Sequence, residues 1–185
     1  MPAKLEREIK LSFADPATAR AAVLAIGASP LKARRLQHDC LLDTGDQQLL
    51  NHRSALRVRS ENGRAVLTFK GPAEASSMKL REEIETEAAD PVILLTILDR
   101  LGLRVSFRYE KYREEFASGD VVIAVDETPV GTFVEIEGSE SGITRAAQAL
   151  GRGPSAYIVD SYRGLFARQC EERGVVVTDM LFGRG

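Results

Sequence analysis

Two glutamates and a lysine alternate near the N-terminus, where Glu6, Glu8 and Lys10 occupy every second position of Glu-Arg-Glu-Ile-Lys. In an extended strand successive side chains point to opposite faces, so these three share one face and Ile9 lies on the other. A solvated ion pair on the outer face of a sheet would contribute little to stability. Recurrence of the same pattern along the chain favours the alternative, in which the charged face lines a binding site.

Charged residues alternate in most of the later segments that read as strands. The acidic positions are Glu6, Glu8, Glu83, Glu85, Asp126, Glu135 and Glu137, and the basic positions are Lys10, Arg57, Arg59, Lys70, Arg81, Lys111 and Arg113. Carboxylate oxygens are the ligands that Mg²⁺ and Mn²⁺ prefer, and arginine binds phosphate through paired hydrogen bonds. The combination therefore indicates a polyphosphate ligand carried with a divalent metal, as phosphoryl chemistry requires.

These residues must be positioned by a set of short strands and a few helices. Strands are predicted at about 4–13, 36–43, 54–61, 64–70, 79–87, 105–116, 121–127 and 132–138. The dipeptide Asn62-Gly63 predicts a two-residue hairpin turn between the third and fourth strands. Helices are predicted near 15–27, 90–102, 141–150 and 160–173, where apolar residues recur at helical spacing.

Eight strands joined by hairpins and single helices suit an antiparallel sheet closed into a barrel. Either the apolar faces point inward and the charges are solvated, or the charges line the interior and helices cover an apolar outside. The second arrangement is favoured because the apolar faces of the helices need a partner. We therefore predict an α+β fold in a single domain, 1–185, with a barrel core at 1–140 that carries two inserted helices and a C-terminal helical segment at 141–185.

Composition excludes several other classes of protein. The chain has 185 residues, a formal net charge of -2 and only two cysteines and two histidines. A generic nucleic-acid-binding protein would be basic, and a zinc site would need more Cys or His residues. The N-terminus is charged and no apolar run approaches a membrane span. We expect a cytoplasmic protein without nucleic-acid or membrane partners. The sequence does not determine the oligomeric state, and a homodimer is one of the possibilities. The run of Lys32, Arg34 and Arg35 is expected to be a solvated loop.

Several short motifs occur in the order seen in a known family. They lie at 6–10 (Glu-Arg-Glu-Ile-Lys), 38–44, 56–59, 68–72, 81–85, 110–113, 125–126, 133–137 and 161–165. In this order and spacing they resemble the CYTH superfamily, the triphosphate tunnel metalloenzymes, which contains class IV adenylate cyclases, thiamine triphosphatases and inorganic tripolyphosphatases. The resemblance covers nearly the whole chain and implies an eight-stranded antiparallel barrel with a charged tunnel.

The resemblance also implies roles for individual residues. It implies that Mg²⁺ or Mn²⁺ is bound by Glu6, Glu8, Glu135 and Glu137, with Asp126 as a further acidic residue of the metal site. It implies that the triphosphate is bound by Lys10, Arg57, Arg59, Lys70, Arg81, Lys111 and Arg113. The catalytic candidates are Lys10, Glu83, Glu85 and Asp126. For Glu83 and Glu85, which would bind metal or position water, the alternative is simple ion pairing with Arg81 and Lys111.

The reaction stays open at this point. Leu41 stands where family members often have an aromatic residue, and the chain has no tryptophan, which makes thiamine triphosphate a less suitable substrate. We expect hydrolysis of inorganic or organic triphosphate; the alternatives are an adenylate cyclase that forms cyclic AMP and pyrophosphate, and a non-catalytic polyphosphate- or nucleotide-binding module. The segment 160–165 resembles the family's C-terminal helix, which can close one end of the tunnel, and we expect it to be a packing helix.

Overall fold

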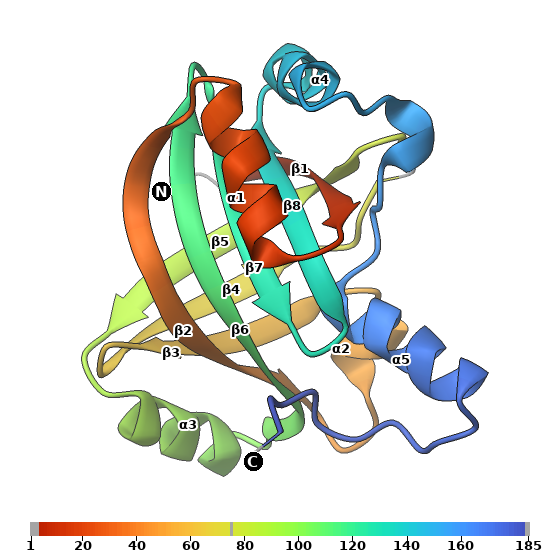
Figure 1. Cartoon of the computed structure of the whole chain (residues 1–185). Coiled ribbons are helices and arrows are strands. Elements are labelled where there is room, and N and C mark those ends of the chain that lie inside the picture. The colour runs from red at the N-terminus through yellow and green to blue at the C-terminus, as the bar shows by residue number, and fades with distance from the viewer. Residues whose placement is uncertain (1–3, 75, 184–185) are drawn as a thin grey trace.

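The computed structural model describes residues 4–74 and 76–183, so both ends of the predicted domain 1–185 lie outside the described residues. Eight antiparallel strands close into a barrel in the order β1-β5-β4-β3-β2-β6-β7-β8 (Figure 1). Their bounds are β1 Lys4–Phe13, β2 Ser29–Asp43, β3 Ala55–Glu61, β4 Arg64–Lys70, β5 Lys79–Ala88, β6 Arg104–Ser118, β7 Val121–Thr128 and β8 Gly131–Gly138. The predicted fold class and closed barrel are confirmed.

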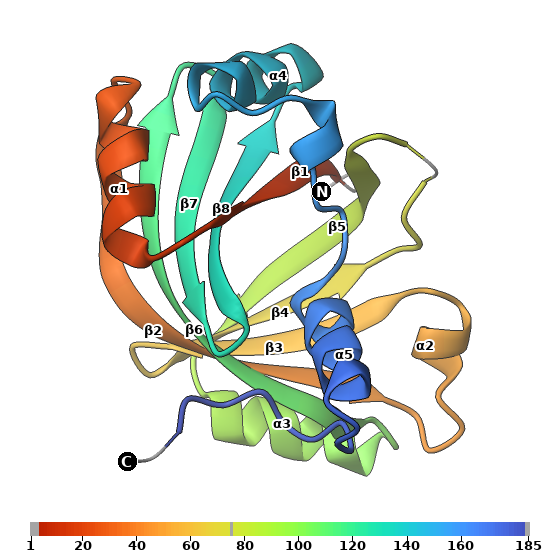
Figure 2. The same ribbon diagram turned by 45° about the vertical axis from the view of Figure 1, so that its right-hand side comes forward.

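Helices lie on the outside of this barrel (Figure 2). Their bounds are α1 Pro16–Ala25, α2 Gln48–Asn51, α3 Pro91–Arg100, α4 Glu140–Ala149 and α5 Tyr162–Glu172, with a short 3-10 turn at Pro154–Ala156. Asp15 and Asp90 cap α1 and α3 through their side chains, as expected for an Asp-Pro helix start. None of the helices in the described part of the chain has the length and apolar character needed to span a bilayer.

The main apolar core lies between the barrel wall and the helices, not inside the barrel. Ile9 from β1 and Ile136 from β8 are fully buried together with Val23 of α1 and Ile143 of α4. A second cluster packs Leu98 of α3 against β2, β3 and β4. The predicted arrangement is therefore confirmed: the main apolar face of the barrel points outward to the helices, and the charged face that carries Glu6, Glu8 and Lys10 points inward.

Replacing Ile136 with alanine should lower the free energy of unfolding by about 2–5 kcal/mol, because the side chain is fully buried between β8 and the helices. The matched control is Leu101→Ala, since Leu101 is 72% exposed and should change stability by less than about 0.5 kcal/mol. Urea unfolding of both variants makes the comparison. Equal effects would contradict a core that lies outside the barrel.

Strand β2 is longer than predicted and begins at Ser29, not near position 36. Its first half pairs with β6 through register irregularities at Pro30/Lys32 and Lys32/Arg35, and such bulges hid the strand pattern in the sequence. The expectation of a solvated loop at Lys32, Arg34 and Arg35 is therefore wrong. Arg34 forms two hydrogen bonds with Glu127, at 2.6 Å and 2.8 Å, so the charge of this run is compensated within the sheet.

The C-terminal tail covers an exposed edge of β6. The backbone N–H of Met180 donates to Arg108 O at 2.9 Å, and the N–H of Glu110 donates to Met180 O at 3.0 Å. Met180 is 1% exposed and packs with Phe107, Tyr109, Phe133 and Tyr162. This aromatic cluster fills the barrel end from which β6 and β8 start.

Candidate active site

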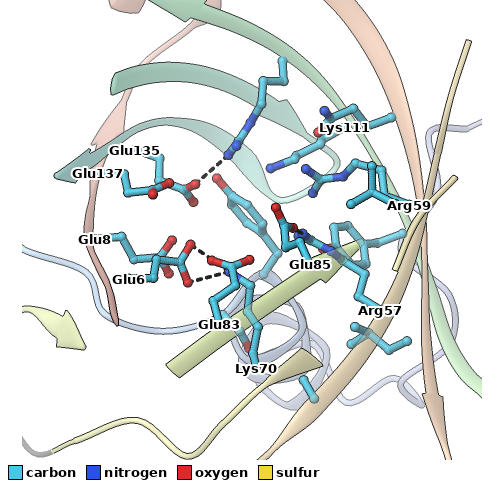
Figure 3. Close-up of a pocket in the computed structure, with 18 of the residues that line it drawn as sticks. Glu6, Glu8, Arg57, Arg59, Lys70, Glu83, Glu85, Lys111, Glu135 and Glu137 are labelled. Carbon is cyan, nitrogen blue, oxygen red and sulfur yellow. Dashed lines mark hydrogen bonds and ion pairs between the residues drawn. The ribbon is translucent and has the colours of Figure 1, made fainter. Parts of the chain in front are cut away.

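A single cavity of about 890 Å³ brings together the charged face predicted from the sequence. Thirteen of the fourteen predicted site residues line it, and Asp126 is the exception. Figure 3 shows several of them, including Glu6, Lys70 and Arg57, around the cavity. The thirteen are Glu6, Glu8, Lys10, Arg57, Arg59, Lys70, Arg81, Glu83, Glu85, Lys111, Arg113, Glu135 and Glu137. They come from six strands, so closure of the barrel is what places them in one cavity.

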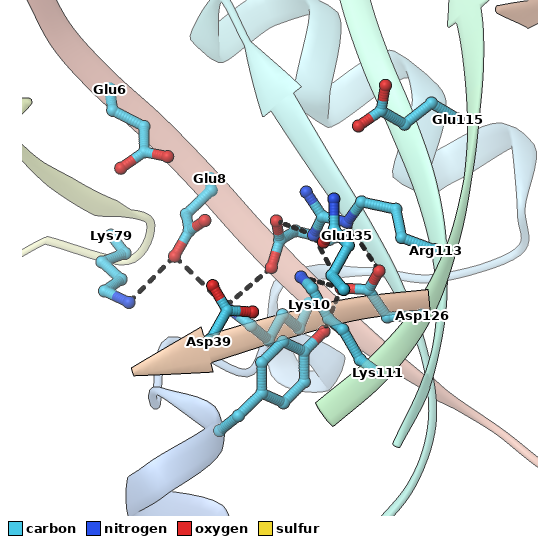
Figure 4. Close-up of polar contacts among 12 residues, drawn as sticks. Glu6, Glu8, Lys10, Asp39, Lys79, Lys111, Arg113, Glu115, Asp126 and Glu135 are labelled. Carbon is cyan, nitrogen blue, oxygen red and sulfur yellow. Dashed lines mark hydrogen bonds and ion pairs between the residues drawn. The ribbon is translucent and has the colours of Figure 1, made fainter. Parts of the chain in front are cut away.

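Glu8 receives two ammonium groups on the same carboxylate oxygen. Lys10 Nζ lies 3.1 Å and Lys79 Nζ lies 2.9 Å from Glu8 Oε1 (Figure 4). Lys10 Nζ also lies 3.2 Å from Glu135 Oε2. Burial raises the pKa of Glu8, but the ammonium of Lys10, together with that of Lys79, outweighs burial and holds this pKa well below its usual range. Burial lowers the pKa of Lys79 to about 8, since Glu8 only partly offsets the loss of hydration.

Glu6, Lys70 and Glu83 form a second group on β1, β4 and β5. Lys70 Nζ donates to both carboxylate oxygens of Glu6, at 2.8 Å and 2.6 Å, and lies 3.2 Å from Glu83 Oε1. Burial and the nearby Glu6 carboxylate raise the pKa of Glu83 to about 7, in spite of the opposing effect of Lys70. Glu83 thus forms an ion pair with Lys70, and its proton occupancy changes near neutral pH.

Arg57 and Arg59 converge on Asp39, which is 1% exposed. Arg59 Nε donates to Asp39 Oδ1 at 2.9 Å, whereas Arg57 Nε lies 3.5 Å from the same oxygen and has no hydrogen-bond partner among the described residues. Glu85 accepts from Thr68 Oγ1 at 2.6 Å and from Arg57 Nη2 at 3.4 Å. Arg57 therefore has donor capacity that its protein neighbours do not use.

Asp126 lies behind the cavity wall and is fully buried. It accepts from Lys111 Nζ at 2.9 Å, from Arg113 through two hydrogen bonds of 2.7 Å and 2.6 Å, and from Tyr162 Oη at 2.6 Å. Burial raises the pKa of Asp126, but Arg113 and Lys111 outweigh it and bring the pKa to about 2. Burial and the neighbouring Arg113 lower the pKa of Lys111 to about 7.

The Asp126 carboxylate should make the free energy of unfolding depend on pH in the acidic range. Because its folded pKa lies below the unfolded value, it contributes about 2 kcal/mol that is present at neutral pH and is lost as pH falls from about 4 to 2. Asp126→Asn removes this titration, so its unfolding free energy should fall less steeply than that of the wild type between pH 5 and pH 3. Urea unfolding at several pH values measures the two slopes, and equal slopes would contradict the ion pairs described for Asp126.

Several residues that line the cavity are not among the predicted site residues. Lys79 lies two positions before Arg81 in β5 and therefore shares its inward face, so the alternation in the sequence could have identified it. Arg35 belongs to the unexpected first half of β2, whereas Gln37 lies in the predicted part of that strand but was not proposed as a site residue. Arg35 lies 2.8 Å from oxygens of Glu61 and Glu115. The helix α5 was expected only to pack. Its first residue, Tyr162, lines the cavity, and Lys10 Nζ lies 5.3 Å from the centre of its ring.

The donor set suits a divalent metal, but the carboxylates are engaged by protein cations. Glu8 stands directly opposite Glu137 in the β1–β8 register, and such facing like charges are unfavourable unless a cation lies near them. Hard carboxylate oxygens from β1 and β8 are ligands that Mg²⁺ or Mn²⁺ prefers. In the described part of the chain, however, no three Asp, Glu, His or Cys side chains converge as a ready metal site.

Comparison with known proteins identifies the family. The model of the CYTH domain matches residues 4–151, which include all eight strands and every predicted site residue. The chain belongs to the CYTH family. A Methanocaldococcus jannaschii protein named "Putative adenylate cyclase" is 29% identical to this CYTH chain over 147 residues, which are 79% of this chain and 83% of the relative.

Solved structures share the fold of this CYTH chain. A "putative adenylate cyclase" from Vibrio parahaemolyticus superposes with a TM-score of 0.77 at 20% identity and covers 89% of this chain and 98% of its own. A Hippeastrum protein, described as a putative adenylyl cyclase with a dominant triphosphatase activity, superposes with a TM-score of 0.65 at 20% identity and covers 94% and 97%. At these identities the likeness shows a shared fold.

Proposed function

We propose that this CYTH protein is a divalent-metal-dependent enzyme that hydrolyses inorganic or organic triphosphate inside the barrel. The observation that carries the proposal is the charge of the cavity, which thirteen Lys and Arg residues and nine Glu residues line among the described residues. The excess of cations suits a polyanion, and the carboxylates suit the metal that accompanies it. The volume of about 890 Å³ lies within the range of small-molecule sites.

Binding of the substrate would exchange partners within the cavity. Arg57 and Arg81 support this because each has an Nε without a hydrogen-bond partner among the described residues, although carboxylate oxygens lie 3.5 Å and 3.8 Å away. Phosphate oxygens would satisfy such donors better than these distant carboxylates do. When the Lys and Arg side chains bind phosphate oxygens, the carboxylates with which they now pair become available to bind the metal.

The metal would be held by Glu6, Glu8, Glu135 and Glu137, and when bound it would neutralise charge on the phosphoryl group that is transferred. Asp126 has a different place, since it does not line the cavity. We assign to it the positioning of Lys111 and Arg113, both of which it accepts from, instead of the metal-binding role expected from the sequence.

Hydrolysis needs a group that accepts a proton from the attacking water. Glu83 is our candidate because it faces the cavity and its pKa lies near 7, which suits a general base at neutral pH. Lys10 would stabilise charge on the phosphate, since its ammonium faces the cavity and the nearby Glu8 and Glu135 keep its pKa above the usual value despite burial. Glu85 would hold Arg57 and Thr68 in place through the contacts described above.

Adenylate cyclase activity is the second candidate, favoured by the names of the Methanocaldococcus and Vibrio proteins. The same cations could hold ATP while its 3′-hydroxyl attacks the α-phosphorus, and the two reactions differ in which phosphorus lies in line with the nucleophile. The description of the Hippeastrum protein, which names a dominant triphosphatase activity, favours hydrolysis. A binding module without turnover is the third candidate.

Product analysis distinguishes the three. The purified protein is incubated with tripolyphosphate or with ATP, each with Mn²⁺ or Mg²⁺, and with EDTA in parallel. We expect metal-dependent release of orthophosphate and no cyclic AMP. Cyclic AMP with pyrophosphate would replace our proposal by the cyclase, and tight binding without turnover would replace it by the binding module.

Triphosphate binding should take up protons near neutral pH. The pKa of Lys111 lies at about 7 and that of Glu83 at about 7. When no metal is bound to offset its charge, a bound polyanion raises both because it favours their protonated forms. Calorimetric titration of tripolyphosphate at pH 7.5 in EDTA, repeated in buffers of different ionisation enthalpy, measures the uptake. Lys111→Arg should reduce the uptake, and an uptake that is the same in the wild type and in Lys111→Arg would contradict the placement of the anion beside Lys111.

A further inference from the structure

Lys79 and Glu8 form a cross-strand pair at the cavity wall. They stand directly opposite each other in the β1–β5 register, and Lys79 is the first residue of β5. Both face inward and both are buried: Lys79 is 8% and Glu8 is 4% exposed. The two side chains are therefore held together out of bulk water, where an ionised group needs a partner of opposite charge.

The two ammonium groups on Glu8 are held differently. Lys10 has further partners in Glu135 Oε2, at 3.2 Å, and in the ring of Tyr162. For Lys79, Glu8 is the one carboxylate within ion-pair distance among the described residues. Lys79 can consequently leave Glu8 without breaking another ion pair, whereas Lys10 cannot.

A metal ion and the Lys79 ammonium compete for the same atom. Both would contact Glu8 Oε1, and two cations at one carboxylate oxygen repel each other. Lys79 also lines the cavity, so the flexible lysine chain can move toward a nearby anion when it leaves Glu8. A phosphate oxygen of the substrate would supply the opposite charge that the displaced ammonium needs.

We infer that Lys79 is a displaceable counter-ion of Glu8: it neutralises this carboxylate while no metal is bound, yields it to the divalent metal, and then binds a phosphate oxygen of the triphosphate. The inference rests on the proposed function, because it takes Glu8 as a metal ligand and a triphosphate as the substrate. It makes Lys79 a positioning residue for the metal and a binding residue for the substrate.

The test is calorimetric titration of Mn²⁺ alone into the wild type and into Lys79→Met, which keeps most of the length of the side chain and removes its charge. Lys79→Met should bind Mn²⁺ about tenfold more tightly, since the competing charge is gone. Lys79→Arg keeps the charge and should bind Mn²⁺ like the wild type. Arg20→Met is the matched control: Arg20 is paired with Glu114 at 3.0 Å and does not line the cavity, and its loss should change the affinity for Mn²⁺ by less than about threefold.

Two further readouts separate this role from a structural one. In EDTA Lys79→Met should unfold at a lower temperature than the wild type, and Mn²⁺ should raise its unfolding temperature by more than it raises that of the wild type. Tripolyphosphate in EDTA should bind more weakly to Lys79→Met. Lys79→Gln is measured in parallel, so that the comparison stands if the methionine variant does not fold.

The outcomes are distinct. Tighter Mn²⁺ binding together with weaker tripolyphosphate binding supports the inference. Equal or weaker Mn²⁺ binding by both Lys79→Met and Lys79→Gln, while the wild type binds Mn²⁺, overturns it and leaves the metal-dependent enzyme standing. A wild type that binds no Mn²⁺ overturns both.

Discussion

Replacing Glu8 with glutamine is expected to abolish metal-dependent turnover, with a loss in kcat of about a thousandfold or more, equivalent to about 4 kcal/mol. Glutamine keeps the size of the side chain but removes the charge that a divalent metal needs from its ligand. The fold should persist because the main apolar core lies between the barrel and the helices. Turnover of tripolyphosphate with Mn²⁺, together with the circular dichroism spectrum and the unfolding temperature of each variant, measures both effects.

The matched control is Glu114→Gln. Glu114 accepts hydrogen bonds from Arg20 of α1 at 3.1 Å and 3.0 Å and does not line the cavity, so this variant should keep the activity of the wild type. Unchanged turnover in Glu8→Gln would remove Glu8 from the metal site. An equal loss in both variants would mean that the effect is a general one of surface charge.

Replacing Arg57 with alanine is expected to weaken triphosphate binding roughly 10- to 100-fold, since a hydrogen bond to a charged group contributes about 1.5–3 kcal/mol. The guanidinium faces the cavity and has unused donor capacity, as its Nε shows. Asp39 keeps Arg59 as a partner at 2.9 Å, so the change does not leave that carboxylate unpaired. Calorimetric titration of tripolyphosphate gives the dissociation constant.

Arg20→Ala serves as the control for Arg57→Ala. Arg20 pairs with Glu114 outside the cavity and is half-exposed, so its loss removes the same charge from the protein without touching the proposed site. The affinity of this variant should stay within about threefold of the wild type. If Arg57→Ala and Arg20→Ala bind tripolyphosphate alike, Arg57 has no part in holding the substrate.

Much of the fold could be predicted from local patterns. The Asn62-Gly63 turn has positive φ at both positions, 51° and 76°, as its residue types require. The inward charges of β1 followed from strict alternation, and the outward apolar face followed from helices that needed a partner. The beginning of β2 could not be predicted in the same way, because Pro30 and two register irregularities interrupt its alternation.

The candidate site was only partly visible in the sequence. Alternation shows which face a side chain occupies, but it does not show how far the side chain lies from the cavity surface. Asp126 shares the inward face of β7, yet hydrogen bonds from Lys111, Arg113 and Tyr162 enclose it. Tyr162 comes from α5, and only the folded chain brings that helix to the aromatic end of the barrel.

The sequence likewise did not predict which charged residues form ion pairs in the cavity. Glu83 was considered as a partner of Arg81 or Lys111, whereas the structure pairs it with Lys70. Residues far apart along the chain, such as Glu6 and Lys70, meet only when β1, β5 and β4 lie side by side. Register across the closed barrel therefore decides which charges neutralise one another, and register depends on the whole fold.

Under the proposed function, metal and triphosphate bind together inside the barrel. The most direct measurement is a crystal structure of the protein with Mn²⁺ and tripolyphosphate, with anomalous data collected at the manganese edge. We predict a manganese peak beside the carboxylates of Glu6, Glu8, Glu135 and Glu137, and phosphate density that contacts Arg57 and Lys79. Manganese and phosphate found only outside the barrel, or an empty cavity at saturating concentrations of both, would contradict the account.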